Sequence, residues 1–384
     1  MAVPTPNRKP TKKKVFSLDD FKKKIGGEDS PAKPLEWYNC SEAVQKATGL
    51  PGFPKGYVSL SRGFSNTGKS TSVLEAAVNA QKQGDMPIFI DTENNIGRER
   101  LKLMGFDLSG NYLYLDNEYL LREFGKKKDK DRNEAAIEDQ ADAIHFFLNL
   151  QEAGELPFNL LFVIDSLGTL DCVRSINAQE KGTSDNNMWN AGAFEHSFKS
   201  IINSRIPASR KQNKEYINTL IAVQKIWIDS MGAGVVKHKV GEAFFFGARL
   251  IYHHGGIAAH GTKLVGGTSK GRTVNYGIET KINVAKNHVD GPLGGISLEG
   301  KLVSTPHGFI FSEDIDKYKK DHILYFRNIL GDDSLNASDI LTKFTDVVDG
   351  EEELNVENIN DTLKANFGRT ESGEEFDLDT GEIK

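Results

Sequence analysis

Short apolar runs alternate with stretches of helical periodicity through the middle of the chain. The runs end in polar residues and are too short for helices, so they predict buried strands at residues 57–60, 87–91, 112–115, 159–165 and 218–223. Apolar residues spaced three and four apart predict helices at residues 70–83, 97–104, 137–148 and 193–205. Strands that alternate with helices form a mostly parallel sheet covered on both faces. The pattern therefore predicts an α/β fold.

The second half of the chain continues this pattern with longer polar interruptions. Three further stretches, residues 244–252, 273–286 and 302–311, are interpreted as strands that complete the sheet. Residues 177–190 and 225–241 are polar and contain glycine, so they predict mobile loops.

Both ends of the chain differ from the middle. Residues 35–50 are interpreted as a helical region, and residues 16–25 as a short amphipathic helix with Ser17 as its N-cap. Residues 315–330 predict one or two helices. We therefore expect a basic arm and helical oligomerisation segment at 1–50, a core domain at 51–311, and a helical segment with an acidic tail at 312–384.

Composition narrows the setting. No apolar run approaches the roughly 20 residues that span a bilayer, and no apolar segment follows the basic N-terminus as it would in a secretory signal. Only two cysteines occur in 384 residues, which favours a reducing, cytoplasmic location. The net charge of −6 does not indicate a nucleic-acid binder by itself, because the distribution of charge matters more than its sum.

Residues 63–70 fit a phosphate-binding loop, Gly-x4-Gly-Lys-Ser, between a predicted strand and a predicted helix. The glycines let backbone N–H groups point at phosphate oxygens, and the helix N-terminus adds its dipole. Lys69 is expected to reach the outer phosphates and Ser70 to ligate Mg²⁺. A chance glycine-rich turn is the alternative, and the order of strand, loop and helix argues against it. The residues expected to hold the nucleotide here are Gly63, Phe64, Ser65, Asn66, Thr67, Gly68, Lys69, Ser70 and Thr71.

Two acids follow predicted strands. Ligands of open α/β sheets bind at the carboxyl ends of the strands, so Glu93 is expected to face the nucleotide. Asp165 ends the apolar run 160–164 and is expected to hold the water shell of Mg²⁺. A capping aspartate is the alternative, and the phosphate loop upstream favours the metal role. No cysteine and histidine cluster has zinc spacing, and His253-His254 is interpreted as a strand end.

The order of these motifs resembles the RecA family, and more closely the phage RecA-like recombinases of the UvsX type, over about residues 55–311. Residues 90–93 resemble the segment with the family's catalytic glutamate, and residues 162–166 its Walker B strand. Gln224 resembles the glutamine that senses the γ-phosphate. Lys286-Asn287-His288 resembles a Lys-Asn-Lys segment that reaches a neighbouring subunit's nucleotide, with His288 in place of a lysine.

The resemblance implies a RecA-like P-loop ATPase core with ATP and Mg²⁺ as cofactors. It implies catalytic roles for Glu93, Lys69, Gln224, Lys286 and His288. Arg100 stands about where the family often has a tyrosine stacked on adenine, and an arginine plane can also stack.

The resemblance also implies a homo-oligomeric helical filament on single-stranded DNA that pairs with double-stranded DNA and exchanges strands in recombination and repair. The two predicted loops lie where the family places its DNA-binding loops. Trp189 is expected either to contact a base or to pack beneath its loop. Single-strand-binding and loader proteins are further implied partners, and a phage protein would act in the host cytoplasm. The candidate DNA contacts are Lys181, Trp189, Lys225, Lys237 and Lys239.

Two other functions use the same nucleotide residues. One is a ring-shaped helicase motor of the same fold, which usually has a large helical N-terminal domain that the roughly fifty residues before the core do not supply. The other is a regulatory scaffold that binds ATP but scarcely hydrolyses it, and the presence of Glu93 argues against this reading.

Overall fold

The computed structural model describes residue 17 and residues 32–125, 132–182, 187–228, 236–237, 242–255, 263–269, 272–290 and 301–328. The predicted basic arm, the predicted helix at 16–25 apart from Ser17, and the acidic residues from 346 onward lie outside the described residues. No helix within the described ranges is long and apolar enough to cross a membrane.

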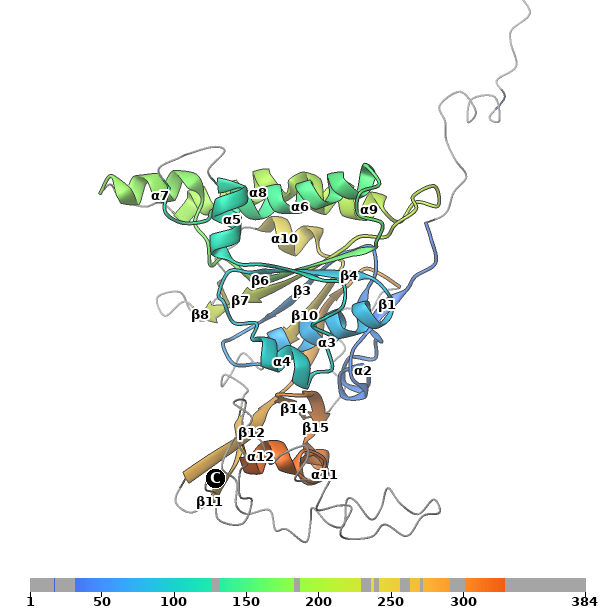
Figure 1. Cartoon of the computed structure of the whole chain (residues 1–384), viewed down its shortest axis with the longest axis vertical. Coiled ribbons are helices and arrows are strands. Elements are labelled where there is room, and N and C mark those ends of the chain that lie inside the picture. The colour runs from blue at the N-terminus through green and yellow to red at the C-terminus, as the bar shows by residue number, and fades with distance from the viewer. Residues whose placement is uncertain are drawn as a thin grey trace, which may run out of the picture.

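A seven-stranded sheet forms the centre of the molecule (Figure 1). Six strands run parallel, and the edge strand β13 pairs antiparallel with β10. Across the sheet the order is β13 (Ile282–Asn287), β10 (Leu250–His254), β3 (Val58–Gly63), β7 (Thr219–Lys225), β6 (Leu160–Leu167), β4 (Met86–Asp91) and β5 (Leu113–Leu115). The predicted α/β architecture with a mostly parallel sheet is confirmed.

Helices cover both faces of this sheet (Figure 1). One face carries α2 (Glu42–Thr48), α3 (Lys69–Lys82) and α4 (Arg98–Leu103). The other carries α5 (Asn117–Glu123), α6 (Ile137–Glu152), α7 (Val173–Glu180), α8 (Asn187–Ser200) and α10 (Glu242–Gly247). A π-helical turn, Ile201–Arg205, joins α8 to the short α9 (Ile206–Ala208).

Alternation along the central strands builds two cores. In β6, Leu160, Phe162 and Ile164 pack on the side of α6 and α8, whereas Leu161 and Val163 pack on the side of α3. All eight residues of β6 are buried, because successive side chains point to opposite faces and both faces are covered. This explains the continuous apolar run at residues 160–164 of the strand.

A second, four-stranded antiparallel sheet lies beside the first. Its order is β11 (Lys263–Ser269), β12 (Arg272–Thr280), β14 (Leu302–Thr305) and β15 (Gly308–Phe311). A 3₁₀ turn (Ser312–Asp314) leads into α11 (Ile315–Asp321) and α12 (Ile323–Asn328), where Tyr318 and Phe326 cluster with Tyr276 of β12. The prediction that residues 273–286 and 302–311 complete the main sheet is therefore wrong, except for β13. The predicted helices within 315–330 are confirmed.

Two more predictions are wrong. Within 35–50 only α2 is helical, and it ends at Gly49, which has φ of 70°. Residues 37–39 instead form β1 (Trp37–Asn39), which pairs with β2 (Gly52–Pro54). Residues 244–247 belong to α10, because Phe244 packs against Phe194 and Phe198 of α8. The predicted strand begins only at Leu250.

The two predicted loops contain regular structure. The end of α7 and the start of α8 lie within 177–190. The Asn190 side chain fixes the first turn of α8, because it binds the Cys172 N–H and the Asp171 carboxylate. Within 225–241, β8 (Trp227–Ile228) pairs antiparallel with β9 (Val236–Lys237). The predicted division at residues 50 and 311 stays a prediction.

Candidate functional site

The phosphate-binding loop lies between β3 and the first turn of α3. Gly68 has φ of 84°, a conformation that side chains other than glycine rarely adopt. A Cβ at Gly68 would also lie 2.6 Å from the ring of Phe309 in β15. Both constraints require glycine, and the predicted strand, loop and helix are confirmed as local structure.

Two buried groups of opposite charge meet at this loop. Burial lowers the pKa of Lys69 to about 8, against the opposing effect of Asp165. Burial raises the pKa of Asp165 to about 6, with the Ser70 hydroxyl opposing. The Lys69 ammonium donates a hydrogen bond to the Phe64 carbonyl oxygen of the loop. A phosphate oxygen bound in the loop could accept the same hydrogen bond.

The donor set suits a magnesium ion that retains other ligands. Ser70 and Asp165 offer hard oxygens, as Mg²⁺ prefers. Among the described residues, no group of three or more His, Cys, Asp or Glu side chains could hold a metal alone. Mg²⁺ is commonly bound through one or two protein oxygens plus phosphates and water, which fits these two residues.

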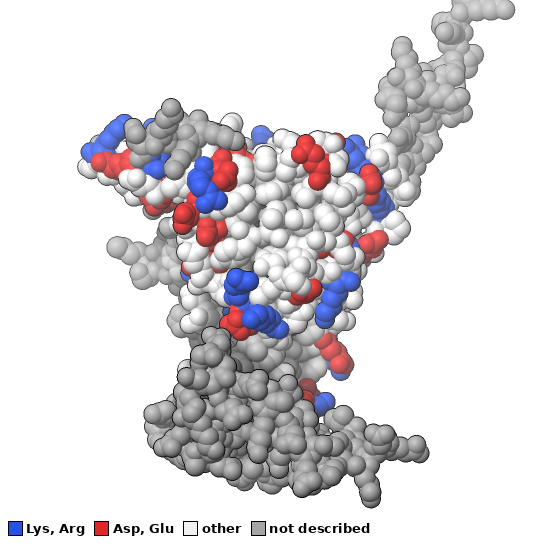
Figure 2. Space-filling model, in the orientation of Figure 1, with Lys and Arg blue, Asp and Glu red and all other residues white. Residues whose placement is uncertain are grey.

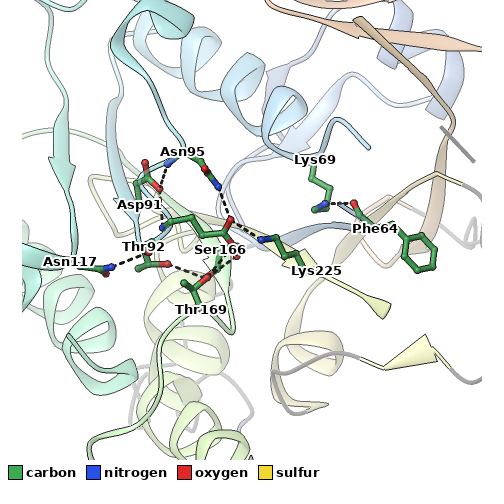
Figure 3. Close-up of polar contacts among 10 residues, drawn as sticks. Phe64, Lys69, Asp91, Thr92, Asn95, Asn117, Ser166, Thr169 and Lys225 are labelled. Carbon is green, nitrogen blue, oxygen red and sulfur yellow. Dashed lines mark hydrogen bonds and ion pairs between the residues drawn. The ribbon is translucent and has the colours of Figure 1, made fainter. Parts of the chain in front are cut away.

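Glu93 lies just beyond β4, with its carboxylate held from two sides. Figure 3 labels the four residues that bind it: Asn95, Ser166, Thr169 and Lys225. Oε1 accepts hydrogen bonds from Ser166 and, at 3.2 Å, from Thr169. Oε2 lies 2.8 Å from Lys225 Nζ and 2.6 Å from Asn95 Nδ2. Burial raises the pKa of Glu93, but these hydrogen bonds and the Lys225 charge outweigh it, so the pKa lies below its ordinary value. The carboxylate is therefore kept ionised and oriented.

The turn that presents Glu93 is shaped by Asp91, the last residue of β4. Its fully buried carboxylate accepts from the N–H groups of Glu93, Asn95 and Ile96. It also accepts from the Tyr114 hydroxyl at 2.7 Å. These four bonds curl the chain directly after the strand and fix where the Glu93 side chain begins.

Gln224 lies in β7, between the phosphate-loop strand and the strand of Asp165. Its side chain is 1% exposed, and neither its amide oxygen nor its amide nitrogen has a hydrogen-bond partner. A buried, unpartnered amide is costly and calls for a specific reason. A ligand with several acceptor oxygens at the carboxyl end of β7 would satisfy the Gln224 nitrogen.

A pocket of about 580 Å³ opens beside these residues at the carboxyl ends of β4, β6 and β7. Glu93 and Lys225 line it together with Ser166, Thr169 and the half-exposed Trp227. The pocket adjoins the Glu93 carboxylate, so it gives solvent and ligands access to that group.

Arg100 of α4 lies over the first turn of α3. Its Nη2 donates to the Thr71 hydroxyl at 2.6 Å, and Thr71 bonds in turn to Ser304 of β14. Burial lowers the pKa of Arg100, with Asp165 opposing. Its Nε is buried without a partner. The predicted stacking on adenine stays a prediction.

Lys286 and His288 lie at the sheet edge, two strands away from β3. Lys286 Nζ donates to the carbonyls of Phe245 and Phe246 at 2.9 Å, the end of α10. Burial lowers its pKa, and Arg249 adds to the shift. His288 is exposed and lies one residue past the end of β13. The structure therefore does not bring either residue to the phosphate loop of its own chain.

The predicted DNA contacts are scattered. Lys181 is exposed at the end of α7, and Trp189 is half-buried with the Arg174 guanidinium 4.1 Å from its ring. Lys225 is paired with Glu93, the side chain of Lys237 is not described, and Lys239 lies outside the described residues. Basic and acidic side chains are interspersed over the described part of the face in Figure 2, so the described residues there form no broad basic patch. The DNA contacts stay predictions.

Sequence reasoning missed the residues that hold Glu93. Ser166 follows Asp165 directly, so its place at the strand end was a usable signal. No sequence signal marked Thr169 or Asn95. The ion pair between Glu93 and Lys225 could not be predicted either, because Lys225 lies 132 positions along the chain from Glu93.

Replacing Lys225 with alanine is expected to move the acid limb of any Glu93-dependent reaction to higher pH. Lys225 lowers the pKa of Glu93, so without Lys225 the effect of burial raises that pKa. Glu93 is then protonated, and no longer able to accept a proton, at a higher pH than in the wild type. Rates measured from about pH 4 to 8, a range that includes the ordinary pKa of a glutamate, test this, with Lys225→Arg, which keeps the cation, as the control. Superimposable profiles for Lys225→Ala and wild type would refute the role of the ion pair.

Part of the chain matches a known family. Residues 24–117, which include the phosphate loop, β4 and Glu93, match the family profile of the RecA N-terminal domain.

Individual relatives also match part of the chain. The chain is 35% identical over 99 residues to protein RecA of Mesomycoplasma hyopneumoniae, covering 24% of this chain and 29% of the relative. It is 32% identical over 111 residues to protein RecA of Aquifex aeolicus, covering 27% and 32%. Protein RecA of Thermotoga petrophila is 35% identical over 85 residues, covering 22% and 24%. The chain spans about a third or less of the length of these relatives.

Proposed function

We propose that this protein is a RecA-type recombinase: a DNA-dependent ATPase that polymerises on single-stranded DNA and catalyses homologous pairing and strand exchange. The finer assignment to the phage proteins of the UvsX type belongs to this proposal and rests on the order of motifs in residues 55–311. A cytoplasmic location, in a host cell if the protein is phage-encoded, follows from the same function.

One observation supports the ATPase most strongly. Gly63, Gln224, Asp165 and Glu93 lie at the carboxyl ends of β3, β7, β6 and β4, which are adjacent strands of one parallel sheet. Ligands bind at that edge of such sheets. A phosphate loop, a metal-binding acid, an ionised carboxylate and an unpartnered amide thus meet at the place where a nucleoside triphosphate would lie.

Each residue has one task in hydrolysis. Lys69 neutralises charge on the outer phosphates, and Ser70 and Asp165 would hold Mg²⁺. Mg²⁺ supplies further neutralisation of the phosphate charge when bound. Glu93 orients the attacking water and accepts its proton. Gln224 contacts the outer phosphate from the strand that leads into Lys225 and β8, which links nucleotide binding to the predicted DNA-binding segment.

Lys286 and His288 are proposed to act on the neighbouring subunit's nucleotide. Lys286 lies on the edge strand β13 and His288 directly past its end, away from the phosphate loop of their own chain, which suits that role. A cation from the next subunit stabilises charge on the transferring phosphoryl group as an arginine finger does. Hydrolysis then requires assembly, because a lone subunit has an incomplete site.

Mixing two inactive variants is expected to restore part of the turnover. Lys69→Ala lacks the phosphate-binding lysine and Lys286→Ala lacks the proposed trans cation. A contact is complete where the loop of a Lys286→Ala subunit meets Lys286 of a Lys69→Ala subunit. Phosphate release from the mixture, compared with each variant alone, measures the recovery. If the two variants co-assemble and no activity returns, Lys286 does not act in trans.

Electron microscopy with ATP and single-stranded DNA distinguishes the proposed function from a ring-shaped helicase motor. We expect open helical filaments whose length follows the DNA. Closed rings of uniform size would favour the motor instead. Absence of any assembly, together with ATP binding without hydrolysis, would favour a regulatory scaffold.

A further inference from the structure

A buried polar cluster lies directly beneath the phosphate loop and takes no part in the chemistry described above. His254, the last residue of β10, is fully buried, and its Nε2 lies 2.8 Å from Ser61 Oγ and 3.3 Å from Ser72 Oγ. Ser61 belongs to β3 and Ser72 to the first turn of α3. The imidazole therefore ties together the strand before the loop and the helix after it.

Both hydroxyls converge on the backbone of the phosphate-binding lysine. Ser72 Oγ donates to the Lys69 carbonyl at 2.8 Å, and Ser61 Oγ lies 3.2 Å from the same oxygen. The two hydroxyls are 3.1 Å apart, so they share their protons with one another, with Lys69 and with the ring. A buried hydrogen-bond network fixes the groups that it holds. The other ring nitrogen of His254, Nδ1, is buried without a partner among the described residues, so Nε2 is the atom that joins the ring to the network.

The cluster is closed in from above. The ring of His254 stacks on Phe309 at a centroid distance of 6.2 Å, and Phe309 also packs against Gly68. The His254 carbonyl would lie 2.4 Å from a Cβ at Gly63, the first residue of the loop. Burial lowers the pKa of His254 to about 3, and Lys69 adds to the shift, so the ring is neutral and adds no charge beside the lysine.

We propose that His254 is a positioning residue for nucleotide binding: through Ser61 and Ser72 it fixes the backbone of Lys69, and thereby aims the lysine at the phosphates. The inference rests on the proposed function only in taking a nucleotide as the ligand. The position of an ammonium at the end of a long side chain depends on its backbone, and misplacement of about 1 Å weakens such contacts strongly.

The adjacent histidine provides a matched control. His253 lies on the opposite face of β10, because successive residues of a strand point to opposite sides. It is also buried, and its surroundings include Arg62 rather than Lys69. A substitution there disturbs the same strand without touching the cluster.

The test is a titration of the full-length chain with a fluorescent ATP analogue and Mg²⁺, with inorganic tripolyphosphate as a competitor that lacks a base. His254→Phe keeps a ring for Phe309 and removes the hydrogen-bonding nitrogen. We expect it to weaken both ligands by about tenfold, the loss of roughly one hydrogen bond. His254→Gln, whose amide reaches the hydroxyls, and His253→Phe should both stay within about threefold of wild type.

Thermal unfolding without nucleotide separates positioning from stability. If His254→Phe fails to fold, Ser61→Ala, which removes the hydroxyl that bridges His254 and Lys69, is expected to weaken both ligands in the same direction. Folded His254→Phe or Ser61→Ala with wild-type affinities overturns the inference, as does equal weakening by His253→Phe. Wild-type protein that binds neither ligand would instead overturn the proposed function.

Discussion

Glu93→Gln is expected to bind ATP about as tightly as the wild type and to hydrolyse it about 10²–10⁴-fold more slowly. Glutamine has nearly the same shape and can still accept hydrogen bonds from Ser166 and Thr169. It cannot accept a proton from water, and it loses the ion pair with Lys225. Binding and turnover should therefore separate.

Single-turnover phosphate release and a nucleotide-binding titration measure the two quantities. Glu99→Gln is the matched control, since Glu99 is an exposed glutamate of α4 whose carboxylate pairs with Lys102 on the same helix. It should hydrolyse ATP at the wild-type rate. Turnover by Glu93→Gln within a factor of a few of wild type would remove Glu93 from its proposed role.

Asp85→Ala is expected to lower the free energy of unfolding by about 3–5 kcal/mol, the range for breaking a buried ion pair. Asp85 Oδ2 lies 2.7 Å from Lys55 Nζ, and both side chains are 4% exposed. The same carboxylate accepts from the Tyr38 hydroxyl of β1 and from Asn159. Its removal leaves a buried lysine whose remaining acidic neighbour, Glu36, is 3.5 Å away and largely exposed.

Urea unfolding of wild type and variant gives the difference in stability. Glu42→Ala, which breaks the exposed pair between Glu42 and Lys46, should leave the midpoint unchanged, because solvent screens such pairs. An Asp85→Ala midpoint that matches the Glu42→Ala midpoint would contradict the prediction.

The central sheet could be predicted from sequence because its signals are local. A fully buried strand such as β6 is a continuous apolar run, and the helix that follows β3 repeats its apolar residues at spacings of three and four. The phosphate loop needs only eight consecutive residues, so its position follows from the motif itself.

The periphery could not be predicted in the same way, since strand partners are chosen over long distances in the chain. Nothing in residues 302–311 tells whether they join the main sheet or pair with β12, as they do. Residues 37–39 become a strand because residues 52–54 offer an edge to pair with. Residues 187–190 read as part of a polar loop, but they form the first turn of α8, where the Asn190 side chain binds Asp171.

In the candidate site, too, some residues could be predicted from local motifs and others could not. Motifs placed Gly63, Asp165 and Glu93 at strand ends, and adjacency in a parallel sheet brought them together. The contacts that tune them come from elsewhere in the chain: Lys225 on Glu93, and His254 on the hydroxyls beneath Lys69. Such pairs leave no periodic trace in a single sequence.

Phosphate release from Mg²⁺-ATP, measured with and without single-stranded DNA, tests the central claim most directly. Lys69→Ala supplies the blank, because loss of the phosphate-binding lysine removes hydrolysis by this site. We expect slow release by wild type alone, and clearly faster release that saturates as single-stranded DNA is added. Release equal to the Lys69→Ala blank, or a rate that DNA does not change, would contradict the assignment of this chain as a DNA-dependent ATPase.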